Sequence, residues 1–503
     1  MSKLAASLVD KFAKYYPNIV PELLALLRSL SSTLHTKFYI AALDALGHIL
    51  MAVGLEKCKP DIGAVLAIVK QFEIGTIKKE SGRDFQLEYL EILVYLARVL
   101  GANFSPIIPH LLPTLFELTS APLDNPLVNS PWAVIEDLTG SSTMPRLLSA
   151  HTDAVEDRVN ALSIVNKLFK LLKGDMLPHV EAMLDITIKN FTEIFDESVQ
   201  LTCLQLFANL LKSAETSQTD LSVRIWEKIF NVFCNRVLNH NPLFEPEQTF
   251  EGIEKCLKVL SFKGINDQLL VKTMEIMKVE IDRTIKDYGS TILSKTPEEE
   301  TITPDDDDYS DFEDDMESGE RSLSAIMDLQ RYLFKQLGAK FLPFWEQVHN
   351  DVFGLSQVLN PSMRSYSIYM FSNLFEFAPA ESVNSTDNVL GVIIRGLSDP
   401  ELTVRHSAVS TVGTVSEFAS AHYKQFLEFV LPVIVKMICS TPASKVRDSV
   451  IDCAISVVGK IMKYQPAIIM SFDTAVQTWI SWLPIQDDDV NFALEYLLEL
   501  IET

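Results

Sequence analysis

Apolar residues recur along this chain at helical intervals. In the last third, the run after Asp399 steps by four, four, three and three residues, and a second run after Thr441 steps by four, four, three and four. A strand would alternate apolar and polar residues by two, so these steps predict amphipathic α-helices in spite of the many valines. The apolar positions are Val404, Ala408, Val412, Val415 and Phe418 in the first run and Val446, Val450, Ala454, Val457 and Ile461 in the second.

Three dipeptides in the same region mark helix starts. They are Asn360-Pro361, Asp399-Pro400 and Thr441-Pro442, spaced by 39 and 42 residues. The first residue of each has a side-chain oxygen that caps free backbone N–H groups, and proline suits the first helical position because its missing N–H costs nothing there. A second helix, which tends to open with an aromatic residue and a proline, precedes each start. This unit of helix A, short turn and helix B, about 40 residues long, is that of HEAT repeats. Asp399 and Arg405 resemble the aspartate–arginine pair that ties the turn in such units.

The whole chain divides into about ten such units. Each unit buries its apolar stripe only against its neighbours. The predicted fold is therefore all-α, a HEAT-repeat right-handed superhelical solenoid (an α-α superhelix) with about ten helix pairs. We expect B helices at residues 36–53, 84–100, 153–172, 197–213, 246–262, 321–338, 361–377, 402–418, 445–463 and 488–502.

Two segments interrupt the repeat. Residues 120–150 form a Pro/Ser/Thr-rich connection inside the third unit. Residues 298–320 carry thirteen acids and no base, and without them the net charge would be −11 rather than −24. Blocks of like charge repel and bury too little surface to order, so we expect an acidic disordered loop at 296–320. This divides the chain into residues 1–295 (about five and a half units), the loop within a repeat, and residues 321–503, which continue the same solenoid.

The acidic loop is a candidate site for contacts with basic cargo or a regulatory protein, since mobile carboxylates attract lysine and arginine. The competing interpretation is a solvated surface loop that binds no partner. Tyr309 and Phe312 favour the first interpretation, because a purely solvating run has no need of aromatic residues, and Ser310 lies in an acidic context that suits phosphorylation. The candidate contact residues are Asp305, Asp306, Asp307, Asp308, Asp311, Glu313, Asp314 and Asp315.

Composition excludes several function classes. A formal net charge of −24 disfavours direct binding of nucleic acid and favours basic partners. The six cysteines are scattered, which predicts plain buried thiols rather than disulfides or a zinc site. Catalytic and metal-ligand motifs are absent from the sequence, so we expect neither an enzyme nor a cofactor. The best candidate membrane span, residues 99–116, contains Asn103, His110 and three prolines, and we expect no membrane insertion.

Acids on the B helices are candidates for a concave binding face, because a solenoid has one long concave surface. Members of several pairs are three or four residues apart and so share one helix face. For any one pair, a solvated helix surface is the competing interpretation. Two interpretations likewise compete for Trp345, Trp479 and Trp482, which either pack in the core or line a cleft that binds a ligand. The candidate acids are Glu88, Glu91, Glu156, Asp157, Glu251, Glu254, Asp448, Asp452, Glu495 and Glu499.

The C-terminal region resembles the karyopherin-β (importin-β) family, and most closely its importin beta-3 branch. The phrases that carry the resemblance are GKIMKYQP at 459–466, WISWLP at 479–484 and the acidic turn at 487–489. Upstream, the acidic insert is followed by a helix and then KFLPFWEQV at 340–348, in the same order as in that branch. Residues 17–118 fit more loosely.

The resemblance implies a nuclear transport receptor that works between cytoplasm and nucleus at the nuclear pore. It implies basic cargo, such as ribosomal proteins and histones, on the acidic B-helix face, and Phe-Gly nucleoporins on the outer A helices. It also implies regulation by the Ran GTPase. With about half the family's twenty or so repeats, the chain resembles the second half of such a receptor. It lacks the N-terminal Ran-binding repeats and the last few repeats, which puts Ran binding in doubt. We expect a monomer.

Two other binding proteins compete with this interpretation. A HEAT-repeat scaffold unrelated to transport remains open, because a fold does not fix a function. An importin-α-like armadillo adaptor would show tryptophans followed four residues later by asparagine. None of the five tryptophans has asparagine at that position, so this adaptor class is discarded.

Overall fold

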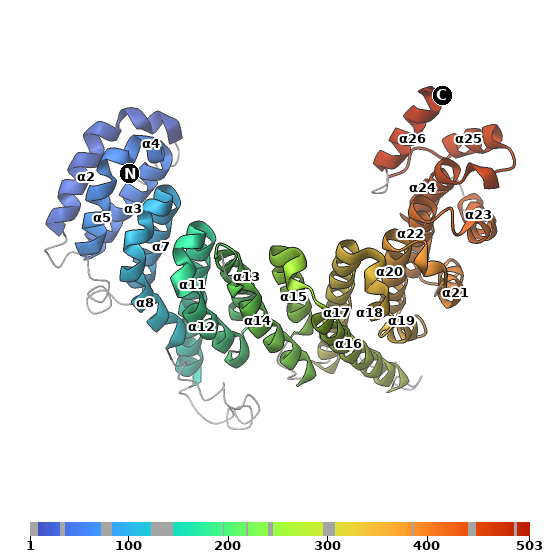
Figure 1. Cartoon of the computed structure of the whole chain (residues 1–503), viewed down its shortest axis with the longest axis horizontal. Coiled ribbons are helices and arrows are strands. Elements are labelled where there is room, and N and C mark those ends of the chain that lie inside the picture. The colour runs from blue at the N-terminus through green and yellow to red at the C-terminus, as the bar shows by residue number, and fades with distance from the viewer. Residues whose placement is uncertain are drawn as a thin grey trace. The chain divides into compact units, whose positions relative to one another are not determined.

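Helices make up all the regular structure in the part of the chain that the computed structural model describes, and they recur in pairs, A then B (Figure 1). No strand occurs in that part, so the fold is the all-α HEAT-repeat type that the periodicity predicts. Two compact units divide the chain: Met1–Arg236 with Lys255–Gly264, and Val237–Glu254 with Ile265–Thr503. The described residues are 9–30, 36–71, 83–121, 144–194, 196–217, 220–239, 245–294, 307–384, 387–440, 449–486 and 490–502.

The first unit contains four helix pairs and most of a fifth. Each pair is an A helix followed by a B helix, and the last B helix is shared between the two units. The pairs are α2 (Tyr16–Leu30) with α3 (Thr36–Val53), α5 (Ile62–Gln71) with α7 (Arg83–Leu100), α8 (Ile108–Ser120) with α11 (Met144–Leu172), α12 (Val180–Glu193) with α13 (Glu197–Ala214), and α14 (Leu221–Leu238) with α15 (Pro246–Leu260). The one-turn helix α4 (Leu55–Cys58) follows α3.

The second unit continues the same alternation. Its first A helix is long, and its second is split by a turn into two short helices. The pairs are α16 (Asp267–Ser294) with α17 (Asp307–Leu337), α18 (Leu342–Trp345) and α19 (His349–Leu355) with α20 (Pro361–Phe377), α21 (Asp387–Gly396) with α22 (Leu402–Phe418), α23 (Lys424–Cys439) with α24 (Ser449–Tyr464), and α25 (Phe472–Ser481) with α26 (Val490–Glu502).

Short 3-10 helices lead into several A helices, where the sequence has its aromatic-and-proline openings. Phe104 and Pro106 lie in η3, which runs directly into α8, and Phe104 is fully buried. Phe341 closes η6 and Pro343 sits in the first turn of α18, so the same device recurs in the second unit. The 3-10 helices are η1 (Val9–Lys14), η2 (Lys59–Asp61), η3 (Gly101–Ile107), η4 (Lys173–His179), η5 (Ser261–Gly264), η6 (Gly338–Phe341), η7 (Glu381–Asn384) and η8 (Pro466–Ile468).

The ten predicted B helices are confirmed, and each ends within two residues of its predicted end. Their starts were harder to predict. Helix α11 begins at Met144, so residues 144–150 are helical rather than part of the connection; Pro145 suits the first turn, where its missing N–H costs nothing. Residues 122–143 lie outside the described part of the chain.

The prediction of an irregular acidic loop was wrong for its second half. Helix α17 begins at Asp307, so residues 307–320 are helical. The physical reason is that carboxylates near a helix N-terminus are stabilised by the partial positive charge of the helix dipole. Residues 296–306 lie outside the described part of the chain, and the side chains of 307–318 are likewise not described.

Of the three predicted helix caps, one is confirmed, one is wrong and one lies outside the described residues. Asn360 caps α20 as expected, since its Oδ1 accepts a hydrogen bond of 3.1 Å from the Met363 N–H. Asp399 does not cap α22, which begins three residues later. Its carboxylate accepts hydrogen bonds of 2.9 and 3.0 Å from the guanidinium of Arg364, in the preceding pair. Arg405 donates instead to the backbone carbonyls of Asp399 and Pro400. The third predicted cap, Thr441, lies outside the described residues.

Tryptophans fill the core, as the first of the two interpretations predicts. Trp345 and Trp479 are buried, and the indole N–H of Trp479 donates to the Ile455 carbonyl at 2.9 Å. The ring of Trp479 lies against Gly459, where an added Cβ would come within 2.9 Å of the indole. Trp482 is only half-buried. The contact explains why α24 has glycine at this position, inside the phrase GKIMKYQP.

The cysteine prediction holds for five residues and is wrong for one. All six cysteines are free, and Cys439 at the end of α23 is exposed while the other five are buried. The stretch Gln86–Ser120 is long and apolar enough to cross a membrane by length and composition. It consists of α7, η3 and α8, whose apolar side chains pack against neighbouring helices, and half of it is buried.

Alanine at Gly459 is expected to destabilise the chain, because the new methyl group would collide with the Trp479 ring. Overpacking of this kind typically costs roughly 1–3 kcal/mol. The matched control is Gly63→Ala in α5, where an added Cβ would meet nothing within 4 Å. There we expect an unchanged or slightly higher stability, by up to about 1 kcal/mol, since alanine favours helix over glycine. Thermal unfolding followed by circular dichroism compares the two, and an equal rise in both variants would refute the packing argument.

A carboxyl group at the start of α15 is held in an unfavourable environment. The side chain of Glu247 is 12 % exposed and lies 3.7 Å from Arg321. Burial, reinforced by the neighbouring charge of Glu245, raises the pKa of Glu247 to about 7 in spite of Arg321. The folded state therefore holds a proton here that the unfolded chain has released, and stability falls as the pH rises from about 4.5 to about 7.

Glu247→Gln should raise the unfolding midpoint at pH 8 and leave it unchanged at pH 4, because the amide never has to ionise. The gain at pH 8 should be on the order of 1 kcal/mol once solvent screening of this partly exposed group is discounted. Thermal melts at both pH values measure it. Glu227→Gln on the exposed face of α14 serves as the control. A gain of the same size at both pH values would contradict the assigned cause.

Candidate binding surface on the B helices

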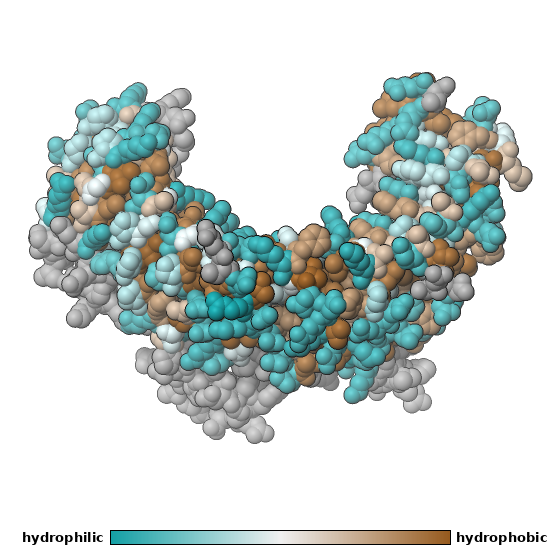
Figure 2. Space-filling model, viewed as in Figure 1, coloured by the Kyte–Doolittle hydropathy of each residue, from teal (hydrophilic) through white to brown (hydrophobic). Residues whose placement is uncertain are grey.

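Consecutive B helices pack side by side within each unit, which places equivalent positions of successive repeats in rows. In the first unit α3 packs on α7, α7 on α11, and α11 on α13; in the second, α17 packs on α20, α20 on α22, and α22 on α24 (Figure 1). Hydrophobic residues are visible between neighbouring helices, and hydrophilic residues cover much of the outward surface (Figure 2). The exposed sides of the B helices are therefore one candidate binding surface in each unit.

Buried amides hold neighbouring B helices in register. Asn209 on α13 donates to Asn166 on α11 at 2.7 Å, and Asn166 donates in turn to Gln205 at 3.2 Å. In the second unit, Asn373 on α20 donates to Gln330 on α17 at 3.0 Å. Such bonds fix the spacing of the rows because an unmatched buried amide would lose a hydrogen bond.

Ion pairs between B helices neutralise several acids of the second unit. Arg331 on α17 lies 3.0 Å from Glu376 on α20, and Lys460 on α24 lies 3.5 Å from Glu417 on α22. Burial raises the pKa of Glu376, and Arg331 opposes that effect.

Four residues on α15, α17 and α20 form what we call the acidic tyrosine cluster: Glu254, Asp328, Tyr332 and Tyr366. Burial raises the pKa of Tyr332, and the nearby charge of Glu254 adds to the effect. Burial also raises the pKa of Tyr366, together with the charges of Glu320 and Asp328. Both hydroxyls therefore stay neutral at physiological pH. Carboxylates with aromatic rings are a combination that holds ammonium and guanidinium groups.

Most of the predicted B-helix acids are solvent-accessible. Glu254 belongs to the cluster, and Glu251 is half-buried one turn before it. In the first unit Glu156 is exposed and Asp157 half-buried near the middle of α11. Four other predicted acids are exposed, and two of them form ion pairs with lysines. Glu91 pairs with Lys167 at 3.1 Å, Glu499 pairs with Lys463 at 2.6 Å, and Glu88 and Glu495 are exposed.

One predicted acid is not on an exposed face. Asp452 is 7 % exposed, and its Oδ2 accepts a hydrogen bond of 2.9 Å from the backbone N–H of Gln486. It fixes the segment between α25 and α26, and the prediction of a ligand-binding role for it was wrong. Asp448, Asp305 and Asp306 lie outside the described residues. The remaining acidic-segment candidates are part of α17 with side chains that are not described: Asp307, Asp308, Asp311, Glu313, Asp314 and Asp315.

The sequence analysis did not predict that Tyr332 and Tyr366 belong to a candidate binding site. A usable signal was present, since Asp328 and Tyr332 are four residues apart and so share one face of α17. The contribution of Tyr366 comes from the next pair and depends on how α20 packs on α17, which no local pattern gives.

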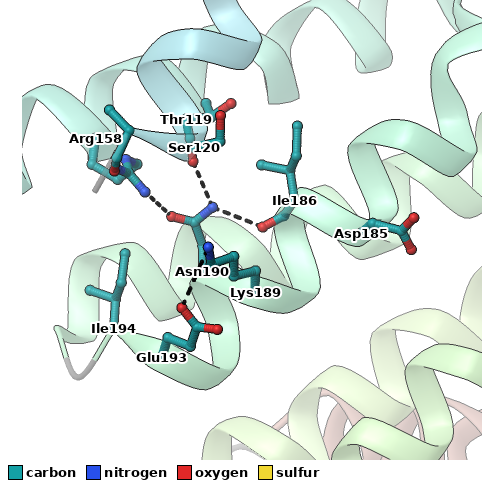
Figure 3. A pocket seen from close by; sticks show the side chains of 10 residues that line it. Thr119, Ser120, Arg158, Asp185, Ile186, Lys189, Asn190, Glu193 and Ile194 are labelled. Carbon is teal, nitrogen blue, oxygen red and sulfur yellow. Dashed lines mark hydrogen bonds and ion pairs between the residues drawn. The ribbon is translucent and has the colours of Figure 1, made fainter. Parts of the chain in front are cut away.

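A pocket of about 420 Å³ lies between the A helices α8 and α12 and the B helix α11 (Figure 3). Its base is a hydrogen-bond network: Arg158 donates to the Asn190 side-chain oxygen at 2.6 Å, and the Asn190 amide donates to the Thr119 carbonyl at 2.8 Å. Ile186 and Ile194 supply apolar lining, and Lys189 and Glu193 stand at its edge (Figure 3). The pocket can take an apolar or aromatic side chain of a ligand.

Comparison with known proteins finds similarity to nuclear transport proteins. Residues 247–356 match the family model Importin repeat 6. Importin subunit beta-3 of Saccharomyces cerevisiae is 20 % identical over 512 residues, which cover 99 % of this chain and 46 % of the relative. The crystal structure of Kap121p bound to the SUMO protease Ulp1p superposes with a TM-score of 0.71 at 17 % identity, covering 99 % of this chain and 45 % of that one.

A second solved structure, Kap121p bound to Nup53p, gives a TM-score of 0.70 at 16 % identity over 99 % of this chain and 45 % of that one. The chain thus spans about half the length of the relatives it matches. The repeat-family match, the importin relative and the shared solenoid fold agree with the motifs at 459–466 and 479–484. The chain therefore shares the solenoid fold of the karyopherin-β proteins and resembles that family, with an importin beta-3 protein among its relatives.

Proposed function

We propose that this chain acts as a nuclear transport receptor of the importin type, binding proteins rather than catalysing a reaction. The observation that carries the proposal is the acidic tyrosine cluster on the exposed side of α15, α17 and α20. Similarity to importin relatives supports the role, and Kap121p, a protein of similar fold, has been solved with the protein Ulp1p bound. The site of action would be the nuclear pore, between cytoplasm and nucleus.

The proposed cargo is a protein segment rich in lysine and arginine, of the kind found in ribosomal proteins and histones. Glu254 and Asp328 would pair with its cations, and the rings of Tyr332 and Tyr366 would cover the aliphatic stems and take part in cation–π contacts. Each exposed ion pair contributes only about 0.2–1 kcal/mol, so affinity would come from several pairs acting together and would fall with salt.

The proposed nucleoporin site is the pocket between α8 and α12. A Phe-Gly repeat offers one aromatic ring and a flexible backbone, which suits an apolar pocket lined by Ile186 and Ile194. Kap121p bound to the nucleoporin Nup53p is the solved precedent in the family. Nucleoporin binding also separates the proposal from its alternative, a HEAT-repeat scaffold unrelated to transport, which has no reason to bind Phe-Gly repeats. Regulation by the Ran GTPase stays a prediction from the resemblance.

Reversing the charge of the cluster should weaken cargo binding. Glu254→Lys combined with Asp328→Lys replaces two attractions with two repulsions, so a lysine-rich peptide should bind about tenfold or more weakly. Fluorescence anisotropy with a labelled peptide at low and at moderate salt measures the change.

The matched control for the cluster is Glu275→Lys with Glu346→Lys, two exposed acids on the A-helix side of the same unit. It alters the net charge by the same amount and should leave affinity within about twofold, because exposed charges beyond about 10 Å are screened. If both double variants lose affinity equally, binding depends on overall charge and the cluster is not the site.

A charge placed in the α8–α12 pocket should abolish nucleoporin binding there. Ile186→Asp would put a carboxylate where an aromatic ring has to be buried, and we expect binding to immobilised Phe-Gly repeats to fall by roughly tenfold. Ala182→Asp, on the exposed side of the first turn of α12, adds the same charge outside the pocket and should bind as the unaltered chain does. Undiminished binding by a folded Ile186→Asp variant would remove this pocket from the proposal.

A further inference from the structure

Basic residues occupy one register position in successive B helices of the first unit. The position is two residues before the helix end, and the residues there are Arg98 in α7, Lys170 in α11, Lys212 in α13 and Lys258 in α15. Because α7 packs on α11 and α11 on α13, equivalent positions lie in a row along one edge of the B-helix surface. We call Arg98, Lys170 and Lys212 the basic row.

The members of the basic row are exposed, and they form no ion pair with any residue in the described part of the chain. Cations near a helix C-terminus are favourable on their own, since they offset the negative end of the helix dipole. That effect accounts for a cation at each helix end. The helix dipole does not explain why exposed cations form a row in a chain whose net charge is −24.

A groove adjoins the basic row between α7 and α11. It encloses about 280 Å³, with Val94, Tyr95 and Leu171 among its lining. Arg98 and Lys170 stand at its rim together with Lys167, which pairs with Glu91. The groove therefore combines apolar lining with an excess of positive charge, so it suits a ligand that has both an apolar side chain and anionic groups.

We propose that the basic row docks an extended acidic segment of a partner protein. Packed helices lie about 8–10 Å apart, and a chain in the polyproline II conformation advances about 3.1 Å per residue with three residues per turn. Every third residue of such a segment therefore lies on one side and would meet a successive cation. The matching segment carries Glu or Asp at every third position. An aromatic or large apolar residue next to the first acid would enter the groove beside Tyr95.

Protein is favoured over nucleic acid by the groove itself. Its apolar residues Val94, Tyr95 and Leu171 suit the apolar side chain that a protein segment offers and a sugar-phosphate backbone lacks. A nucleic-acid groove also tracks many phosphates with many cations, and this row offers only a few. The inference does not depend on the proposed cargo role, since the acidic tyrosine cluster would bind the opposite charge through other residues.

The test uses the full chain and a labelled synthetic dodecapeptide with Glu at every third position and one Phe before the first Glu. Lys170→Glu with Lys212→Glu should weaken binding about tenfold or more at low salt, because two attractions become repulsions. Arg224→Glu with Lys228→Glu on the exposed side of α14 changes the net charge equally and should leave binding within about twofold. Circular dichroism verifies that both variants fold.

A second peptide of the same composition, with all its Glu residues contiguous, tests the spacing and should bind more weakly than the first. Three outcomes would overturn the proposal: no binding of the first peptide at low salt, an equal loss in both double variants, or no preference between the two peptides. Tighter binding of a single-stranded oligonucleotide of equal length than of the first peptide would assign the row to nucleic acid and overturn it as well.

Discussion

A pair of helices about 40 residues long has too little apolar surface to fold alone, and it reaches a stable state only by burying its stripe against the pairs beside it. Every other feature of this chain follows from that constraint. Apolar residues must recur at helical intervals in each pair. The B helices must pack in sequence, with polar residues on the side left open. Buried amides such as Asn209 and Asn373 then fix the register between neighbours.

The alignment of neighbouring B helices brings single residues together into binding surfaces. Once the B helices are held in line, a residue type repeated at one position becomes a row, and the two ends of the helices acquire different characters. In the first unit Glu88 lies toward the start of α7 and Glu156 near the middle of α11, whereas cations such as Arg98 and Lys170 lie toward the helix ends. One array of repeats can thereby offer separate sites to ligands of opposite charge, as the proposals for the acidic tyrosine cluster and the basic row require.

Features set by local sequence were predictable here, and features set by contacts between pairs were not. The ends of the B helices and the Asn360 cap follow from patterns a few residues long. The partner of Asp399 turned out to be Arg364, 35 residues away in another pair. The burial of Asp452 depends on the backbone of Gln486. Tyr366 joins the acidic tyrosine cluster only because α20 packs on α17. The start of α17 was misjudged because charge repulsion was weighed and the helix dipole was not.

The tryptophans of the A helices give the molecule built-in optical reporters. Trp226 lies in α14 of the first unit, while Trp345 in α18 and Trp479 in α25 lie at two places in the second, and all three are buried. An indole fluoresces at shorter wavelength when it is buried away from water. In a repeat array whose pairs are stabilised only by their neighbours, a local opening exposes the nearest indole first. A chain that keeps one of the three, with the other four tryptophans replaced, would therefore report the local opening of its own region by a shift of its emission wavelength.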